Sequence, residues 1–227
     1  MSDASSRTTA PIQAFVAGFV DTVGFVGLFG LFTAHVTGNF VMLGASIAET
    51  RSGVVAKLVA LPVFFLAVAG TSLFLRRCAT SGRDPVVGVF GAQAFFLACF
   101  LGVAVITGPF HGGDQPFAIV AGMLGVVAMA IQNAASRTIF SVFSPTTIMT
   151  GNSTQVVLDL VELTRGAAAD PAARTRIGKM LPPLAAFVVG ALAGGGGYVL
   201  AGFWALMVPI LLILFLLLTR RTAVRPA

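Results

Sequence analysis

The side chains best suited to bind a small molecule occur in two copies of one tripeptide, Thr-Gly-Asn, inside a very apolar chain. The second copy begins 113 positions after the first. A threonine at a helix N-cap accepts hydrogen bonds from free backbone N–H groups, and glycine allows close backbone approach. An asparagine in the first helical turn can donate to a solute or to the other copy. We therefore predict that both tripeptides, with the threonines as N-caps, line one binding site: Thr37, Gly38, Asn39, Thr150, Gly151 and Asn152.

Five more polar residues lie within or beside apolar segments and complete the candidate site: Asp21, His35, Gln132, Asn133 and Arg137. A carboxyl group deep in an apolar helix either couples a proton or cation or is a protonated acid bonded between helices, and both interpretations stay open for Asp21. Arg137 either reaches the membrane surface by snorkelling or pairs with Asp21 or an anionic solute. His35, whose counterpart is Ile148, is expected to be a hydrogen-bonded packing residue.

The composition indicates a protein that lies in a lipid bilayer. Of the 227 residues, 57% are apolar and only 10% are charged, whereas a soluble domain carries about 25% charged residues. The net charge of +6 could indicate nucleic-acid binding. The basic residues, however, lie in short loops and at the tail, a placement that sets membrane orientation. We therefore expect the lipid bilayer, and no nucleic acid, as a partner.

The sequence gives little support for an enzyme, a metal site or a cofactor. Cys78 and Cys99 form neither a CxxC pair nor a metal-ligand spacing. The GxSxG, HExxH and phosphate-loop motifs do not occur. Asp21 with His35 is a weak catalytic candidate, because fourteen positions separate them and a contact is not expected. We expect no enzymatic activity, no metal and no cofactor.

Six apolar segments are long enough to span a bilayer, which takes about 20 helical residues. Two further segments, 38–50 and 151–164, are helical in pattern but too short. Roughly 13 residues reach about 20 Å, so these two are predicted to be re-entrant half-helices. In the last third of the chain, Gly190 and Gly194 form a small-xxx-small pair suited to close helix packing. The six predicted spans are 11–33, 54–75, 86–107, 116–138, 180–200 and 203–219.

The two halves of the chain repeat one pattern beyond the tripeptides. Thr33 matches Thr146, and Asp21 lies opposite Gln132 and Asn133 when an offset of one or two residues is allowed. Each short segment has a glutamate near its end, Glu49 or Glu162, which an arginine follows. In the second half both Asp159 and Glu162 are expected to pair with Arg165. The chain is therefore divided into two repeats, 1–110 and 111–227.

The distribution of basic residues decides how the repeats are oriented. With three spans in each half the second repeat is inverted, and nearly all the arginines then lie on the side of both termini. A parallel arrangement would place Arg76, Arg77 and Arg83 on the opposite side, against the positive-inside rule. We therefore predict an all-α integral membrane protein with six transmembrane helices and two re-entrant half-helices. It forms a 3+3 inverted repeat with cytoplasmic N- and C-termini.

The chain also resembles a known family in its motifs. "GFVDTVGF…LFTAHVTGNFVMLGASIA", followed by "MAIQNAASRTIF…TTIMTGNSTQVV", resembles the YoaK-like family of bacterial inner-membrane proteins. The likeness covers nearly the whole chain and rests on Asp21, the two tripeptides and the Gln132–Asn133 pair. It implies a multi-pass protein of the bacterial inner (plasma) membrane. The resemblance does not supply a substrate, because the family is classed as one of unknown function.

These features favour a transporter or channel for a small polar solute. Two half-helix N-termini directed at the membrane centre would attract an anionic solute, because each carries about half a positive charge. Asp21 would favour proton coupling. The alternative is a membrane sensor or assembly subunit without transport, whose basic loop 165–179 binds a partner through Arg174, Arg176 and Lys179. A homo-oligomer stays open in either case.

Overall fold

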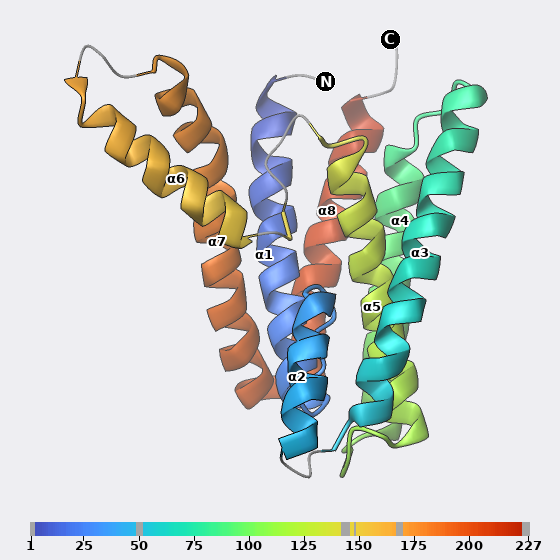
Figure 1. Ribbon diagram of the computed structural model, residues 1–227. Helices are drawn as coiled ribbons and strands as arrows, with labels where there is room; N and C mark the ends of the chain where they lie inside the picture. Colours follow the sequence, from blue (N-terminus) through green and yellow to red (C-terminus); the bar gives the residue numbers. More distant parts are fainter. Residues whose placement is uncertain (1–2, 49–51, 142–145, 148, 167–169, 224–227) are drawn as a thin grey trace.

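The computed structural model describes residues 3–48, 52–141, 146–147, 149–166 and 170–223, and the regular elements among them are all helices. Figure 1 shows a bundle in which α1 begins and α8 ends at the same end. Helices α3, α4 and α5 form one side of the bundle, and α7 lies against α1 on the other. The elements are α1 (Asp3–Gly27), α2 (Val36–Ala48), α3 (Val54–Thr80), α4 (Val86–Thr107), α5 (Pro116–Arg137), α6 (Met149–Leu163), α7 (Ala172–Ala201), the 3₁₀ helix η2 (Gly202–Leu206) and α8 (Met207–Ala223).

Five segments are long and apolar enough to cross a membrane: Thr8–Gly27, Val54–Thr80, Val86–Thr107, Pro116–Arg137 and Ala172–Thr219. The last has 48 residues and contains both α7 and α8. At η2 the chain reverses, and α8 returns along the bundle (Figure 1). The chain is therefore an all-α, multi-pass membrane protein. The sequence predicted two separate spans where this helical hairpin lies.

Several helix boundaries differ from the sequence prediction, and two of them are the end of α1 and the start of α7. The first span was predicted to reach residue 33, but α1 ends at Gly27. The chain turns there because Phe29 and Gly30 have positive φ angles of 57° and 81°, which an α-helix does not accommodate. Residues 28–35 then form the connection to α2. At the other boundary, α7 starts at Ala172 rather than at residue 180.

The two short helices lie where the sequence predicted half-helices. Helix α2 has 13 residues and α6 has 15. Figure 1 shows that both begin near the middle height of the bundle and run to opposite ends. Helix α2 runs away from the end that holds the termini, and α6 runs towards it. The starts of both helices therefore lie deep within the height of the bundle.

The closest helix packing is that of α1 against α7. A Cβ atom on Gly190 would lie 2.2 Å from the backbone oxygen of Phe15, and one on Gly194 would lie 2.5 Å from that of Phe19. From α1, Gly18 approaches the backbone oxygen of Phe187 in the same manner, at 2.3 Å. These glycines bring the two backbones into direct contact, which confirms the predicted packing role of Gly190 and Gly194.

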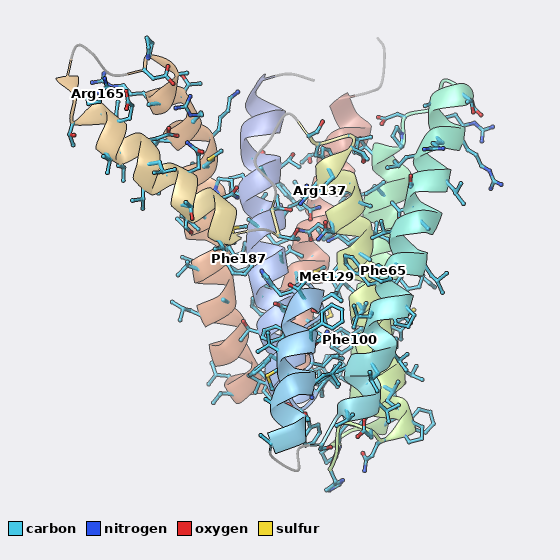
Figure 2. All side chains as sticks on the ribbon, in the orientation of Figure 1. Phe65, Phe100, Met129, Arg137, Arg165 and Phe187 are labelled. Carbon is cyan, nitrogen blue, oxygen red and sulfur yellow. The ribbon has the colours of Figure 1, made fainter. Side chains whose placement is uncertain are left out.

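Apolar side chains fill the interior and also cover the outside of the bundle. Phe100 and Met129 are fully buried in the interior (Figure 2). By contrast, Phe65, Leu192 and Leu200 are 63%, 73% and 88% exposed. Apolar side chains on both the inside and the outside are expected of helices that are surrounded by lipid.

The start of α3 is held by a carboxylate from another loop. Asp114 accepts hydrogen bonds from the backbone N–H groups of four successive residues, Gly53, Val54, Val55 and Ala56, at 2.8–3.2 Å. Nearby, the buried Nζ of Lys57 donates to three backbone oxygens, including that of Phe29 at 2.9 Å. The α4–α5 loop thus caps α3 and fixes this end of the bundle.

Replacing Asp114 with alanine is expected to lower the thermal unfolding midpoint in detergent. Four N–H groups lose their acceptor, and loss of a helix N-cap costs about 1–2 kcal/mol. Asp84→Ala is the matched control, because Asp84 accepts a single N–H, from Val86, at the start of α4. Equal midpoints for the two variants would contradict the role assigned to Asp114.

Candidate functional site

Asp21 organises the connection between α1 and α2. The residue is buried, at 5% exposed. One oxygen accepts hydrogen bonds from the backbone N–H groups of Thr33 and Ala34, both at 2.7 Å, and lies 3.3 Å from the Thr33 hydroxyl. The other oxygen lies 2.7 Å from Nδ1 of His35. Asp21 therefore fixes the chain immediately before α2.

The contact between Asp21 and His35 corrects the expectation that these residues do not meet. The connection 28–35 returns along α1 and brings His35 back to the level of Asp21. The His35 ring also packs edge-on against Phe32 and Phe187, with ring centroids 6.5 and 5.4 Å away. The interpretation of His35 as a hydrogen-bonded packing residue is confirmed.

The side chain of Asn39 forms its hydrogen bonds within its own repeat. Its side chain is fully buried, its Oδ1 accepts the backbone N–H of Phe32, and its Nδ2 donates to the backbone oxygen of Phe32, both at 2.9 Å. Gly38 makes room for the Phe32 ring, since a Cβ there would lie 2.7 Å from it. These two hydrogen bonds make Asn39 a clasp on the connection before α2.

The threonines of the two tripeptides are not N-caps. Helix α2 begins at Val36 and α6 at Met149, so Thr37 and Thr150 both lie inside the first turn. Both side chains are exposed, as is Gly151. The N-cap prediction was wrong because each helix starts one residue before its tripeptide. Neither threonine therefore occupies the N-cap position from which it was predicted to bind the free N–H groups.

The second copy reproduces the central contact of the first with a neutral side chain. Gln132 is 2% exposed, and its Nε2 donates to the Thr146 hydroxyl at 3.0 Å. In each half, a polar residue of the long helix thus binds the threonine four positions before the tripeptide. Asn152, like Asn39, is buried, at 5% exposed. The residue that matches Phe32 is Pro145, which lies outside the described residues.

Asn133 and Arg137 are not part of these clusters. Asn133 is half-buried, and its backbone oxygen accepts the Ser136 hydroxyl at 2.8 Å. Arg137 is the last residue of α5 and is exposed, and Figure 2 marks its position. The groups that bind the Asp21 carboxylate come from residues 33–35. The predicted alternative in which Arg137 pairs with Asp21 is therefore not observed.

Two buried glutamines were missed by the sequence analysis. Gln13 of α1 and Gln93 of α4 are 4% and 0% exposed, and their amides bind each other at 3.1 and 3.3 Å. Gln93 also donates to Oε1 of Gln132 at 2.8 Å, and Gln132 donates to the backbone oxygen of Gln13 at 2.8 Å. Both could have been selected from the sequence, because each glutamine is a polar residue inside an apolar segment, which indicates a buried polar contact.

An ion-pair network joins α6 to the start of α7. Arg176 binds the buried carboxylate of Asp159, with its Nε 3.0 Å from both oxygens, and binds Asp170 at 2.8 Å. The backbone N–H of Ala172 and the Arg176 guanidinium hold the pKa of the Asp170 carboxyl below its usual value. The predicted Glu162–Arg165 pair is present at 3.0 Å. The prediction for Asp159 was wrong, because its partner is Arg176.

The described residues contain no group of three or more His, Cys, Asp or Glu side chains placed to hold a metal ion. What the fold does bring together is buried carboxamide, hydroxyl and carboxylate groups beside the starts of two short helices. This arrangement defines a multi-pass helical membrane protein with clusters of buried polar groups inside an apolar bundle.

Comparison with known proteins places the chain in a family. The model of the family described as "Protein of unknown function (DUF1275)" matches residues 10–219, and the chain belongs to this family. It is 27% identical over 156 residues to the UPF0700 transmembrane protein YoaK of Bacillus subtilis (strain 168), an alignment that covers 68% of this chain and 67% of that protein. No solved structure matches the chain.

Proposed function

We propose that this protein is a transporter or channel that moves a small polar solute past the starts of α2 and α6. The observation that carries the proposal is that two short helices begin at the middle height of the bundle beside buried polar groups. Non-helical backbone at membrane depth is tolerated only inside protein or beside a water-filled cavity. In several transporters, interrupted helices of this kind form the solute site.

The helix packing supports an inverted repeat in which α2 and α6 are re-entrant. In an inverted repeat, α1, α2, α3 and α4 correspond to α5, α6, α7 and α8. The contact of α1 with α7 then corresponds to that of α5 with α3, and the contact of α4 with α5 to that of α8 with α1. The contact of α2 with α3 likewise corresponds to that of α6 with α7, and all of these pairs are in contact. In this correspondence the two repeats face each other, as 3+3 inverted repeats do in known transporters.

The orientation of the bundle follows from its basic residues. The ends of α3 and α6 and the starts of α4 and α7 lie at the end of the bundle that also holds both termini (Figure 1). These helix ends and the loops beside them carry six of the twelve arginines, among them Arg76, Arg77, Arg165 and Arg174. By the positive-inside rule this end is cytoplasmic. For a bacterial protein the membrane is then the inner membrane.

The expected preference for an anionic solute loses support at α2. The Asp21 carboxyl group accepts hydrogen bonds from the two residues that precede His35, so an acidic group already occupies the space beside the positive end of this helix. At α6 the neutral Gln132 takes the corresponding place. Any attraction for an anion is therefore confined to α6, and the proposal is a small polar solute.

The other functions considered from the sequence are less well supported. Both oxygens of Asp21 are engaged by residues 33–35, so we propose no catalytic role for the Asp21–His35 pair. A sensor or assembly subunit was expected to bind its partner through Arg174, Arg176 and Lys179. Arg176 is instead bound to Asp159 and Asp170 within the chain.

Thiol labelling tests the polar path without knowledge of the solute. In a variant with Cys78 and Cys99 replaced by serine, Thr37→Cys and Thr150→Cys are expected to react with a membrane-impermeant methanethiosulfonate reagent, because a polar path keeps their side chains in water. Leu192→Cys is the control, since this exposed side chain of α7 faces lipid. Reaction of Thr37→Cys and Thr150→Cys no faster than that of Leu192→Cys would overturn the proposal.

A further inference from the structure

A narrow pocket lies among α1, α4, α5 and the chain before α6. Its empty volume is about 320 Å³ including the open mouth, and the room inside is about that of one water molecule. Apolar walls, among them Val89 and Phe140, alternate with six polar side chains, and none of the lining residues is charged. The polar side chains are Thr9, Gln13, Gln93, Gln132, Ser136 and Thr146.

The chemistry of this pocket selects against ions. A charged guest would give up its hydration without a countercharge, at a cost of several kcal/mol. A small uncharged amide gives up much less, and carboxamide groups can replace its hydrogen bonds with water. The six polar side chains offer both donors and acceptors, which matches a guest that carries C=O and N–H groups.

The hydrogen bonds between the glutamines show how a guest could enter. Gln13 and Gln93 pair amide to amide, at 3.1 and 3.3 Å, and these are the longest bonds of the cluster. A small amide presents the same C=O and N–H groups, so it can replace one glutamine as the partner of the other. The guest restores the hydrogen bonds of one glutamine, and the contacts of the guest must offset the loss of a partner by the other.

We propose that this pocket is a binding site for a small uncharged amide and that Gln93 is its central recognition residue. Gln93 contacts both Gln13 and Gln132, so it touches every carboxamide in the pocket. Gln132 in turn binds Thr146, in the chain that leads into α6. That the bound amide is also the transported solute rests on the proposed function. Binding of the amide to the pocket can be tested separately.

The experiment uses the full chain in lipid nanodiscs with its five glutamines labelled with ¹⁵N: Gln13, Gln93, Gln115, Gln132 and Gln155. Titration with acetamide is expected to give saturable shifts of the side-chain amide signals of the three pocket glutamines. Gln115 and Gln155, which are not in the pocket, serve as internal controls. Acetate has nearly the shape of acetamide but carries a charge, and it is expected to produce no saturable shift.

Gln93→Met is expected to weaken the acetamide response of Gln13 and Gln132 at least tenfold, while Gln155→Met leaves it unchanged. The comparison of acetamide with acetate needs no substitution, so it decides the proposal even if Gln93→Met fails to fold. No saturable shift with acetamide, or equal shifts with acetate, overturns the pocket assignment.

The outcomes separate this inference from the proposed function. Saturable acetamide shifts together with lipid-like labelling at Thr37→Cys and Thr150→Cys would support the pocket and overturn the transport path. Rapid labelling at both positions without acetamide shifts would support the path and overturn the pocket.

Discussion

Replacing Gly190 with alanine is expected to force α7 away from α1 and to destabilise the whole bundle. The added Cβ would lie 2.2 Å from the backbone oxygen of Phe15, and a backbone atom cannot rotate out of the way. Overpacking of a well-packed interior costs about 1–3 kcal/mol, and a clash with backbone belongs at the upper end of that range. The thermal unfolding midpoint and the yield of monodisperse protein in detergent measure the effect.

Gly196→Ala on the same helix is the matched control. No atom outside the neighbouring backbone lies within 4 Å of a Cβ at Gly196, so this substitution is expected to be neutral or to stabilise the helix by up to about 1 kcal/mol. Gly194→Ala, with a contact of 2.5 Å to Phe19, should behave like Gly190→Ala. If Gly190→Ala and Gly196→Ala unfold at the same temperature, the close approach of α1 and α7 is wrong.

The sequence predicted the helices well because each rule it used is local. The apolar segments give the long helices, and segments of insufficient length give α2 and α6. The packing of Gly190 and Gly194 follows from their spacing on one helix face. The end of α1 was missed because it depends on the φ angles of Phe29 and Gly30. Phenylalanine is not a residue type that indicates a turn, so a positive φ angle at Phe29 could not be predicted.

The candidate site was predicted in its residue types but not in its contacts. Asp21 and Gln132 were matched by position, and both bind the threonine that precedes the tripeptide in their half. The hydrogen bonds of Asn39 to Phe32 and the contact of Asp21 with His35 depend on a connection that folds back along α1. Neither the helical periodicity of the sequence nor the repeat between its halves predicts a connection that folds back in this way. Gln13 and Gln93 have no counterparts in a repeat pattern, so the comparison of the halves did not select them.

Replacing Asp21 with alanine is expected to disorganise the chain before α2. The backbone N–H groups of Thr33 and Ala34 are buried and would lose their acceptor, and the His35 ring would lose its hydrogen-bond partner. Each buried donor left without a partner costs about 1–3 kcal/mol, so the total is expected to exceed about 3 kcal/mol. A large fall in the thermal unfolding midpoint, comparable to that of Gly190→Ala, is the expected measurement.

Asp21→Asn separates the hydrogen bonds of this residue from its charge. The amide oxygen can still accept from Thr33 and Ala34, so the unfolding midpoint is expected to change little. The effect of the charge is measured in the Thr37→Cys background. The cysteine is labelled with a cationic and with an anionic thiol reagent, and the ratio of the two rates is compared with and without Asp21→Asn. A charge in this position acts with on the order of 1 kcal/mol on each reagent, in opposite directions, so the ratio should fall by about thirtyfold.

The result also decides whether a carboxylate or a carboxylic acid stands beside α2. An unchanged ratio in Asp21→Asn would mean that Asp21 carries no charge at neutral pH, and the argument against an anion at α2 would then be lost. A lowered ratio with a retained fold would show that Asp21 acts at a distance on groups entering from water. That property would be required of a residue that couples a proton or cation to the movement of a solute.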